Sequence, residues 1–215
     1  MAWDTEGTRR KLKEAATVEF AEHGPDGTTM ARIAARAGIN KERLYKYFGD
    51  KQSLFATVLT DELEKLAASV PPPEGGFADV SDFAGRTFDY HTAHPRLARL
   101  LLWEGLTGQP VADEENRTAL YRRKARAYAA AQEDGIFDDA IDADHLAFLI
   151  IALAAWWSAV PQLAHMLTGA TGAERAEHAR RRATVIRAAE RLALPHDAPA
   201  PRAPKKKGSA GRGSG

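Results

Sequence analysis

The sequence predicts an all-α protein of about nine helices, divided into an N-terminal three-helix unit and a larger C-terminal helical domain. Two observations favour this fold class. Apolar residues recur at the helical spacings of three and four along most of the chain, and clusters of Gly and Pro separate the helical segments. The expected divisions are residues 1–51 for the first unit, 52–194 for the second domain and 195–215 for a basic tail.

The composition is that of an ordinary soluble protein, with 44% hydrophobic and 27% charged residues in a chain of 215. The chain has no cysteine, which excludes a disulfide framework and a thiolate metal site. The N-terminus is polar through Asp4, Glu6 and Arg9 and lacks the apolar core of a secretory signal. We therefore expect a cytoplasmic protein.

Charge is distributed unevenly along the chain. Residues 1–51 hold 10 basic and 8 acidic side chains (net +2), residues 52–194 hold 15 and 20 (net −5), and residues 195–215 hold 5 and 1 (net +4). A phosphate backbone would be repelled by the middle of the chain and accepted by the N-terminal unit. The tail is expected to be disordered, and its lysines could either attract DNA weakly or serve only solubility.

The first helix is expected from about Gly7 to Glu22, because Leu12, Ala16 and Phe20 share one face. A His-Gly-Pro-Asp-Gly segment then ends it. The start of this helix is basic and could either touch phosphates or form a solvated tip. The basic residues there are Arg9, Arg10, Lys11 and Lys13.

The next stretch predicts two short helices joined by a tight turn. Gly38 stands where a helix end favours a positive φ, and Asn40 can cap a second helix that begins at Lys41. If Leu44 and Phe48 are buried against the first of these two short helices, the second short helix turns a polar, basic and aromatic face outward. Such a face suits a groove edged by phosphates. An ordinary αα-hairpin with a solvated face would show the same pattern. The apolar stripe of the first short helix consists of Met30, Ile33, Ala34 and Ala37.

The segment IAARAGINKERLYKYFGDKQSLF resembles the signature of TetR-type transcriptional regulators. In that signature an alanine–glycine turn leads to a helix ending in leucine–tyrosine, then phenylalanine, then lysine, at fixed spacing. The match covers about residues 9–60 and departs mildly at Asn40, where serine is frequent, and at the variable positions of Lys46 and Tyr47. The matching residues are Ala37, Gly38, Leu44, Tyr45, Phe48 and Lys51, followed by Leu54 and Phe55.

This resemblance implies a helix-turn-helix DNA-binding domain followed by a helical ligand-binding and dimerisation domain. The second short helix would enter the major groove, with base contacts from Glu42, Arg43 and Lys46. Neighbouring residues are expected to contact the phosphates, and two residues at the start of the second short helix complete the predicted DNA-binding set. These further DNA-binding residues are Thr28, Thr29, Asn40, Lys41, Tyr45, Tyr47 and Lys51.

Asp50 is expected to cap a helix that runs to about Ser69 and joins the two domains. After the break at Pro71–Gly76, helices are expected at about 78–93, from Pro95 onward, and at about 113–134. The last of these is rich in basic residues, which could form a nucleic-acid patch. Its acidic neighbours favour a solvated face instead. The basic residues are Arg117, Arg122, Arg123, Lys124 and Arg126.

The segment Leu146–Val160 is apolar on every side. It is shorter than the about 20 residues that cross a bilayer, so no membrane span is expected. A helix of this kind must be covered all round, and a second copy of the chain is the simplest cover. Pro161 interrupts the segment, and Thr171 with Glu174 fits a capping box for the final helix. The resemblance implies a homodimer through the last two long helices.

Aromatic residues of the C-terminal domain could form core or line a pocket, and the resemblance implies a pocket for an unknown, largely apolar small molecule. A metal site of His91 and His94 with Glu104 or His145 is a less favoured alternative. No cofactor is expected, and neither a GxSxG elbow nor a glycine-rich phosphate loop indicates an enzyme. The expected ligand-binding residues are Tyr90, His94, Trp103, Phe148 and Trp156.

Together these observations predict a ligand-responsive transcriptional regulator, most often a repressor, rather than an enzyme. It would bind a palindromic double-stranded DNA operator as a dimer and be released by a small molecule. The alternative is a helical-bundle protein that binds a small molecule or a metal without binding DNA. Salt-sensitive binding to a duplex would separate the two.

Overall fold

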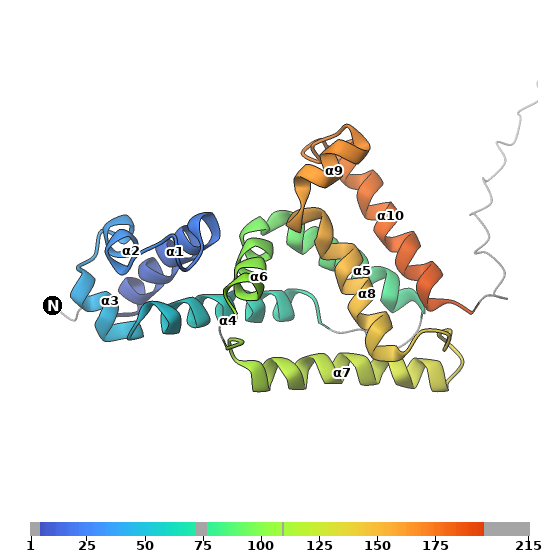
Figure 1. The fold of residues 1–215 in the computed structure, drawn as a ribbon. Helices are drawn as coiled ribbons and strands as arrows, with labels where there is room; N and C mark the ends of the chain where they lie inside the picture. The colour runs from blue at the N-terminus through green and yellow to red at the C-terminus, as the bar shows by residue number, and fades with distance from the viewer. Residues whose placement is uncertain (1–4, 72–76, 109, 196–215) are drawn as a thin grey trace, which may run out of the picture.

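The computed structural model describes residues 5–71, 77–108 and 110–195, and within these ranges the chain forms ten helices and no strand (Figure 1). The expected tail lies outside the described residues apart from Pro195. The helices are α1 (Thr5–His23), α2 (Met30–Ala37), α3 (Lys41–Phe48), α4 (Lys51–Ser69), α5 (Phe77–Ala93), α6 (Pro95–Thr107), α7 (Glu114–Glu133), α8 (Ala143–Ala159), α9 (Pro161–Thr168) and α10 (Arg175–Ala193).

The three N-terminal helices pack around one small core together with the start of α4 (Figure 1). Leu12 of α1, Ile33 of α2 and Leu44 of α3 are fully buried there. Phe20 of α1 meets Phe55 of α4 edge to face, with ring centroids 5.2 Å apart. The three-helix unit is therefore joined to α4, and the position of α4 influences that of α3.

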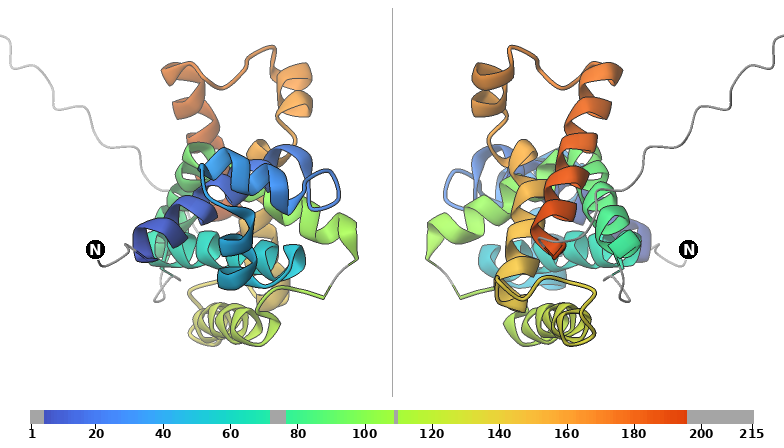
Figure 2. Two further views of the ribbon diagram at one scale, coloured as in Figure 1. Left: turned by 90° about the vertical axis from the view of Figure 1, so that its left-hand side faces the viewer. Right: turned by 90° about the vertical axis from the view of Figure 1, so that its right-hand side faces the viewer.

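The C-terminal domain is centred on α5, α8 and α10, and α7 packs against α8 at one side (Figure 2). Side-chain hydrogen bonds tie α5 to α10: Arg182 Nε donates to Asp89 Oδ2 at 2.7 Å, and Ser81 Oγ donates to Glu190 Oε1 at 2.8 Å. The inner face of α5 is largely apolar, with Thr87 and His91 as buried polar residues. Its buried residues include Val80, Phe83, Phe88 and Tyr90.

A second connection between the domains runs through α6, which packs against both α1 and α4. Arg99 Nε donates to the carbonyl oxygen of Ala21 at 2.5 Å, and its Nη2 donates to that of Glu22 at 3.3 Å. Both carbonyls lie in the last turn of α1, where a helix has no donors of its own for them. The body of the molecule thus holds the three-helix unit at α6 as well as at α4.

The helix count exceeds the expected nine because Pro161 begins a helix of its own. The axes of α8 and α9 differ by 85°, and proline at the first position of α9 cannot donate the hydrogen bond that would continue α8. In the described ranges no single helix has the length and apolarity to cross a membrane, and only α8 and α9 taken together, despite their bend, reach them.

The predicted capping box of the final helix is wrong. α10 begins at Arg175, and Glu174 at its N-cap position makes no side-chain hydrogen bond to the helix. Thr171 Oγ1 instead accepts from the N–H of Ala173 at 3.4 Å, which closes a local turn before the helix starts.

Candidate nucleic-acid interface and sensing cavity

The turn between α2 and α3 is set by two capping residues. Gly38 adopts a left-handed conformation with φ +66°, and its N–H donates to the carbonyl of Ala35 at 3.1 Å. A Cβ at Gly38 would meet no atom within 4 Å, so glycine is favoured here by φ alone. Asn40 Oδ1 accepts from the N–H of Glu42 at 2.8 Å and starts α3. Both predicted caps are confirmed.

α3 turns its apolar side to the core and its polar side outward. Leu44 and Phe48 are 0% and 6% exposed. Tyr45 is exposed, with the Nζ of Lys41 at 5.5 Å from its ring centroid. The predicted orientation is confirmed, whereas contact with DNA stays a prediction. The outward and flanking residues are Lys41, Glu42, Tyr45 and Lys46, which are exposed, and Arg43 and Tyr47, which are half-buried.

The two threonines before α2 have different roles. Thr29 is exposed, and its Oγ1 accepts from the N–H of Arg32 at 3.2 Å to cap the helix. Thr28 is buried, and its Oγ1 donates to Glu19 Oε2 at 2.9 Å. The expected phosphate contact through the Thr28 hydroxyl is therefore wrong, because that hydroxyl points into the interior.

Glu19 is a buried acid on the inner face of α1 that sequence reasoning missed. Arg36 Nε donates to its Oε1 at 2.7 Å, and Arg32 Nη2 lies 3.0 Å from its Oε2. Burial raises the pKa of Glu19, but hydrogen bonds from Arg36 and Thr28 and the charges of both arginines outweigh burial and hold the pKa below its usual value. Its place on the apolar face of α1 was the available signal.

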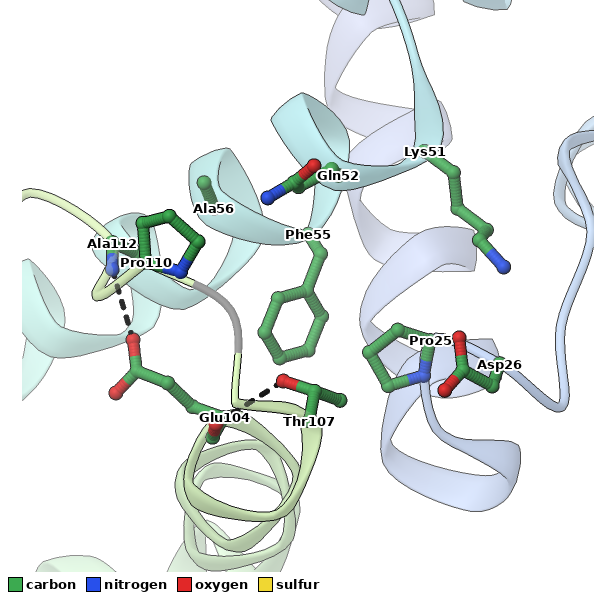
Figure 3. A pocket seen from close by; sticks show the side chains of 10 residues that line it. All are labelled: Pro25, Asp26, Lys51, Gln52, Phe55, Ala56, Glu104, Thr107, Pro110 and Ala112. Atoms are coloured by element: carbon green, nitrogen blue, oxygen red, sulfur yellow. Dashed lines mark hydrogen bonds between the residues drawn. The ribbon is translucent and has the colours of Figure 1, made fainter.

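Lys51, the first residue of α4, lies at the edge of a cleft of about 160 Å³ between the α1–α2 turn, α4 and α6 (Figure 3). Phe55 extends into the middle of this cleft. Lys51 Nζ donates to the carbonyl oxygen of Thr28 at 3.4 Å. An ammonium has three donors, so this contact fixes the side chain and still allows a phosphate contact.

The five residues expected to line a ligand pocket do not share a cavity. Tyr90 is buried and stacks on the exposed His94, with ring centroids 4.0 Å apart. Trp103 of α6 lies against Gly24 in the turn after α1, where a Cβ would come within 2.8 Å of the indole. Tyr90 therefore serves core packing and Trp103 the contact between domains, whereas His94 lies at the surface.

The other two expected ligand residues, Phe148 and Trp156, are 70% and 53% exposed on α8. Both side chains point away from the interior of the domain and line no internal cavity, although Trp156 lines an open apolar groove. Contact of these two residues with a ligand stays a prediction. They belong to an apolar outer face of α8 and α9, which holds a groove of about 500 Å³. The exposed residues that join them on this face are Leu149, Leu163, Met166 and Leu167.

A cavity of about 100 Å³ does lie inside the C-terminal domain, among α4, α5, α6, α7 and α8. Its apolar walls include Leu66, Leu101 and Ile151. Polar side chains from α5 and α7 complete the lining, and we call this site the sensing cavity. These polar residues are Thr87, His91, Arg117, Tyr121 and Lys124.

Two basic residues of α7 depart from the predicted solvated face. Arg117 is only partly exposed, and its guanidinium donates to both carboxylate oxygens of Glu104 at 2.8 and 3.0 Å. Lys124 is 9% exposed and lies beneath the rings of Phe83 and Tyr121. The prediction is wrong for these two residues, although Arg122, Arg123 and Arg126 are exposed as expected.

The metal alternative gains no support. His91 is buried beside the sensing cavity, whereas His94 is exposed with its Nδ1 2.9 Å from the carbonyl oxygen of Tyr90. Glu104 is engaged by its ion pair with Arg117. Within the described ranges, only one group of possible ligands gathers closely enough for a metal ion, and all of its members are exposed. They are Asp142, Asp144 and His145.

A small helical unit that presents one side of α3, attached through α4 to a helical domain with an internal cavity, defines a helix-turn-helix DNA-binding regulator. Known families agree with this class. Residues 12–58 match the bacterial regulatory proteins of the tetR family, and residues 79–191 match the tetracyclin repressor-like C-terminal domain. The chain belongs to the TetR family of transcriptional regulators.

Similar proteins share most of this length. The HTH-type transcriptional repressor SCO4008 of Streptomyces coelicolor is 43% identical over 170 residues, which cover 78% of this chain and 87% of the relative. The HTH-type transcriptional regulator RutR of Escherichia coli K12 is 27% identical over 169 residues, covering 76% and 79%. The crystal structure of the transcriptional regulator SCO4942 from Streptomyces coelicolor superimposes with a TM-score of 0.74 at 32% identity, covering 86% of this chain and 98% of the other.

Proposed function

We propose that the protein is a repressor that binds a palindromic operator as a homodimer and releases it when a small molecule fills the sensing cavity. The observation that carries the proposal is the orientation of α3. Its residues Leu44 and Phe48 are buried, whereas Glu42 and Lys46 are exposed. The name of the repressor SCO4008 supports the sign of regulation. In this proposal residues 1–51 recognise DNA, residues 52–194 sense and dimerise, and the site of action is cytoplasmic.

The outward side of α3 supports a division between base and phosphate contacts. Glu42 can accept from a cytosine amine, and Lys46 can donate to guanine O6 or N7 in the major groove. Arg43 flanks them. The remaining residues around α3 would hold the helix on the backbone through hydroxyl, amide and ammonium groups. These are Thr29, Asn40, Lys41, Tyr45, Tyr47 and Lys51.

The exposed apolar face of α8 and α9 supports dimerisation. Phe148, Trp156 and Met166 are between 53% and 72% exposed in the isolated chain, and contiguous apolar surface of this kind marks protein interfaces. The exposed side of α10 beside it carries Ala176, Ala179 and Ala183, whose small side chains permit close approach of another helix. A two-fold pairing of α8 and α10 would cover both surfaces.

The sensing cavity lies where a ligand can act on DNA binding through α4. Leu63 and Leu66 of α4 line the cavity, as does Val70 just after the helix, and α4 also carries Phe55 against Phe20 of α1. A ligand that binds one position of α4 more tightly than another would change the spacing of the two α3 helices in a dimer. Operator affinity would then fall by a factor set by that difference in ligand affinity.

The test is selection of duplexes from a random pool, followed by binding titrations at two salt concentrations with variants of α3 and α4. Lys46→Ala should weaken binding by about 1–3 kcal/mol and relax the preference at one base position, because it removes a base contact. Lys51→Ala should weaken binding about equally across sequences, because phosphates are common to all duplexes. Arg122→Ala, at an exposed position of α7, is the control and should bind like the parent protein.

Three results would contradict the proposal. The protein could select no duplex, or binding could be insensitive to salt. Alternatively, Lys46→Ala could leave both affinity and base preference unchanged, which would show that α3 does not enter the groove with this face.

A further inference from the structure

The sensing cavity contains an unpaired cation. Within the described part of the chain, no carboxylate lies within ion-pair distance of the Lys124 ammonium, which instead has the ring centroids of Phe83 and Tyr121 at 5.1 and 5.8 Å. The side chain is 9% exposed. A buried ammonium without a counter-ion is unfavourable, and burial together with the nearby Arg123 lowers the pKa of Lys124. A bound anion would relieve both effects.

A second polar group of the same cavity lacks a partner. His91 is 2% exposed, and its Nδ1 makes no hydrogen bond to the described residues. Burial and the neighbouring His94 lower the pKa of His91 to about 4, so the imidazole is neutral at pH 7. A neutral imidazole offers one N–H donor and one acceptor, and which nitrogen carries the proton can follow the ligand. His91 can therefore donate one hydrogen bond to an acceptor in the cavity.

The other charged residues around the cavity do not change the sign of its net charge. Arg117 is neutralised by its bidentate pair with Glu104, and the described residues that line the cavity include no aspartate or glutamate. The cavity thus has Lys124 as its uncompensated charge and buried donors around it. An anion is favoured in such a site, whereas a cation is repelled.

The remainder of the cavity fixes the size and polarity of the rest of the ligand. Its walls are apolar at Leu66, Leu101 and Ile151, and its volume is about 100 Å³. An engineered enclosed cavity of about 150 Å³ holds benzene. The present cavity is smaller but opens to solvent, so it suits a short branched chain, or one small ring with an edge in the opening.

We propose that the sensing cavity binds a small organic monocarboxylate, with its carboxylate on Lys124 and His91 and its apolar body against Leu66, Leu101 and Ile151. The regulatory meaning of this site rests on the proposed function, whereas the binding itself does not. The anion would pair with a charge already buried in the protein, and so it would gain affinity that an uncharged molecule of the same shape lacks.

The test compares ligands that match in shape and differ in charge. Calorimetric titration of the full-length protein should rank benzoate above neutral benzamide by at least about tenfold, with cationic benzamidine weakest. Isobutyrate and isobutyramide form a smaller pair that should show the same order. Equal affinities within each pair, tighter binding of benzamidine, or no binding of either acid at millimolar concentration would overturn the proposal.

Variants assign the preference to residues. Lys124→Met keeps the length of the side chain without its charge, so the affinities for benzoate and benzamide should become equal within about twofold. Arg123→Met, at the exposed neighbouring position on α7, should keep the parent preference. His91→Gln provides an independent variant, in which the preference for benzoate should fall but remain. A full preference in folded Lys124→Met would overturn the assignment.

Operator binding separates this inference from the proposed function. Arg123→Met, which changes neither the lining of the cavity nor α3, should bind the selected duplex as the parent does. If benzoate binds but does not release the duplex, the ligand class stands and the proposed release mechanism fails. If the protein binds no duplex, the charge preference measured by calorimetry still decides the present proposal.

Discussion

At the scale of single residues, His91 links folding to pH. Its imidazole is buried on α5, and burial, with a further contribution from His94, lowers the pKa of His91 from 6.5 to about 4. Two basic residues of α7, Arg117 and Lys124, line the same cavity. The folded chain therefore takes up this proton at a lower pH than the unfolded chain does.

We predict that the free energy of unfolding falls as the pH drops from about 6.5 to about 4, because only the unfolded chain is protonated at His91 in that window. The full difference corresponds to about 3 kcal/mol. Urea unfolding at fixed protein concentration should show a flatter pH profile for His91→Gln than for the parent. His165→Gln, at an exposed position of α9, is the control. Parallel profiles for the parent and His91→Gln would contradict the assignment.

At the scale of helices, α2 and α3 follow rules that act within one turn of the chain. The left-handed Gly38 ends α2, and Asn40 begins α3 through its own side chain. Both features depend on residues a few positions apart, which is why the sequence predicted them. The inward direction of Leu44 and Phe48 follows from the same local periodicity.

Several buried positions on α7 and next to α1 were not predictable in this way. Lys124 and Tyr128 lie four residues apart on the buried side of α7. The prediction of a solvated face was wrong for this side because exposed arginines lie close to Lys124 in the sequence. Thr28, which precedes α2, is buried where Glu19 of α1 accepts a hydrogen bond from its hydroxyl. Partners distant in the sequence decide such positions, and one sequence does not contain their arrangement. The prediction that five aromatic residues share one pocket was wrong for the same reason.

We predict opposite effects for two Gly→Ala substitutions in helical surroundings. Gly38→Ala should destabilise the protein by about 1 kcal/mol, because alanine at φ +66° is strained although no atom lies within 4 Å of its Cβ. Gly105→Ala, inside α6 and equally free of contacts, should stabilise by about 0.5–1 kcal/mol, because its backbone is helical. Urea unfolding measures both. Equal signs would show that conformation is not what selects glycine at position 38.

At the scale of the whole molecule, the apolar outer face of α8 and α9 has no partner among the residues that the structure describes. Trp156 and Leu167 are 53% and 78% exposed there, beside the groove between these helices. The sequence indicated that this region needs cover, because the segment that became α8 is apolar on every side. It could not show which aromatic side chains would point outward.

We predict that Trp156→Glu weakens dimerisation at least about 30-fold, because a buried charge would replace a large aromatic anchor. Sedimentation at micromolar concentration should show monomer for this variant and dimer for the parent. Operator affinity should fall with it, since two half-sites must be bound together. Leu106→Glu, at a 74% exposed leucine of α6, should remain dimeric. A dimeric Trp156→Glu would place the interface elsewhere.

The hydrogen bonds of Arg99 to the last turn of α1 limit how the DNA-binding unit can move. A rigid body attached at several separated points cannot turn independently of the parts that hold it. Here α4 contacts the unit through Phe55 on Phe20 and Asp61 on Lys13, while α6 contacts it through Arg99 and Trp103. The unit should therefore follow α4 and α6, so a signal from the domain interior would reach α3 as a displacement of these two helices or as rotation of the entire subunit.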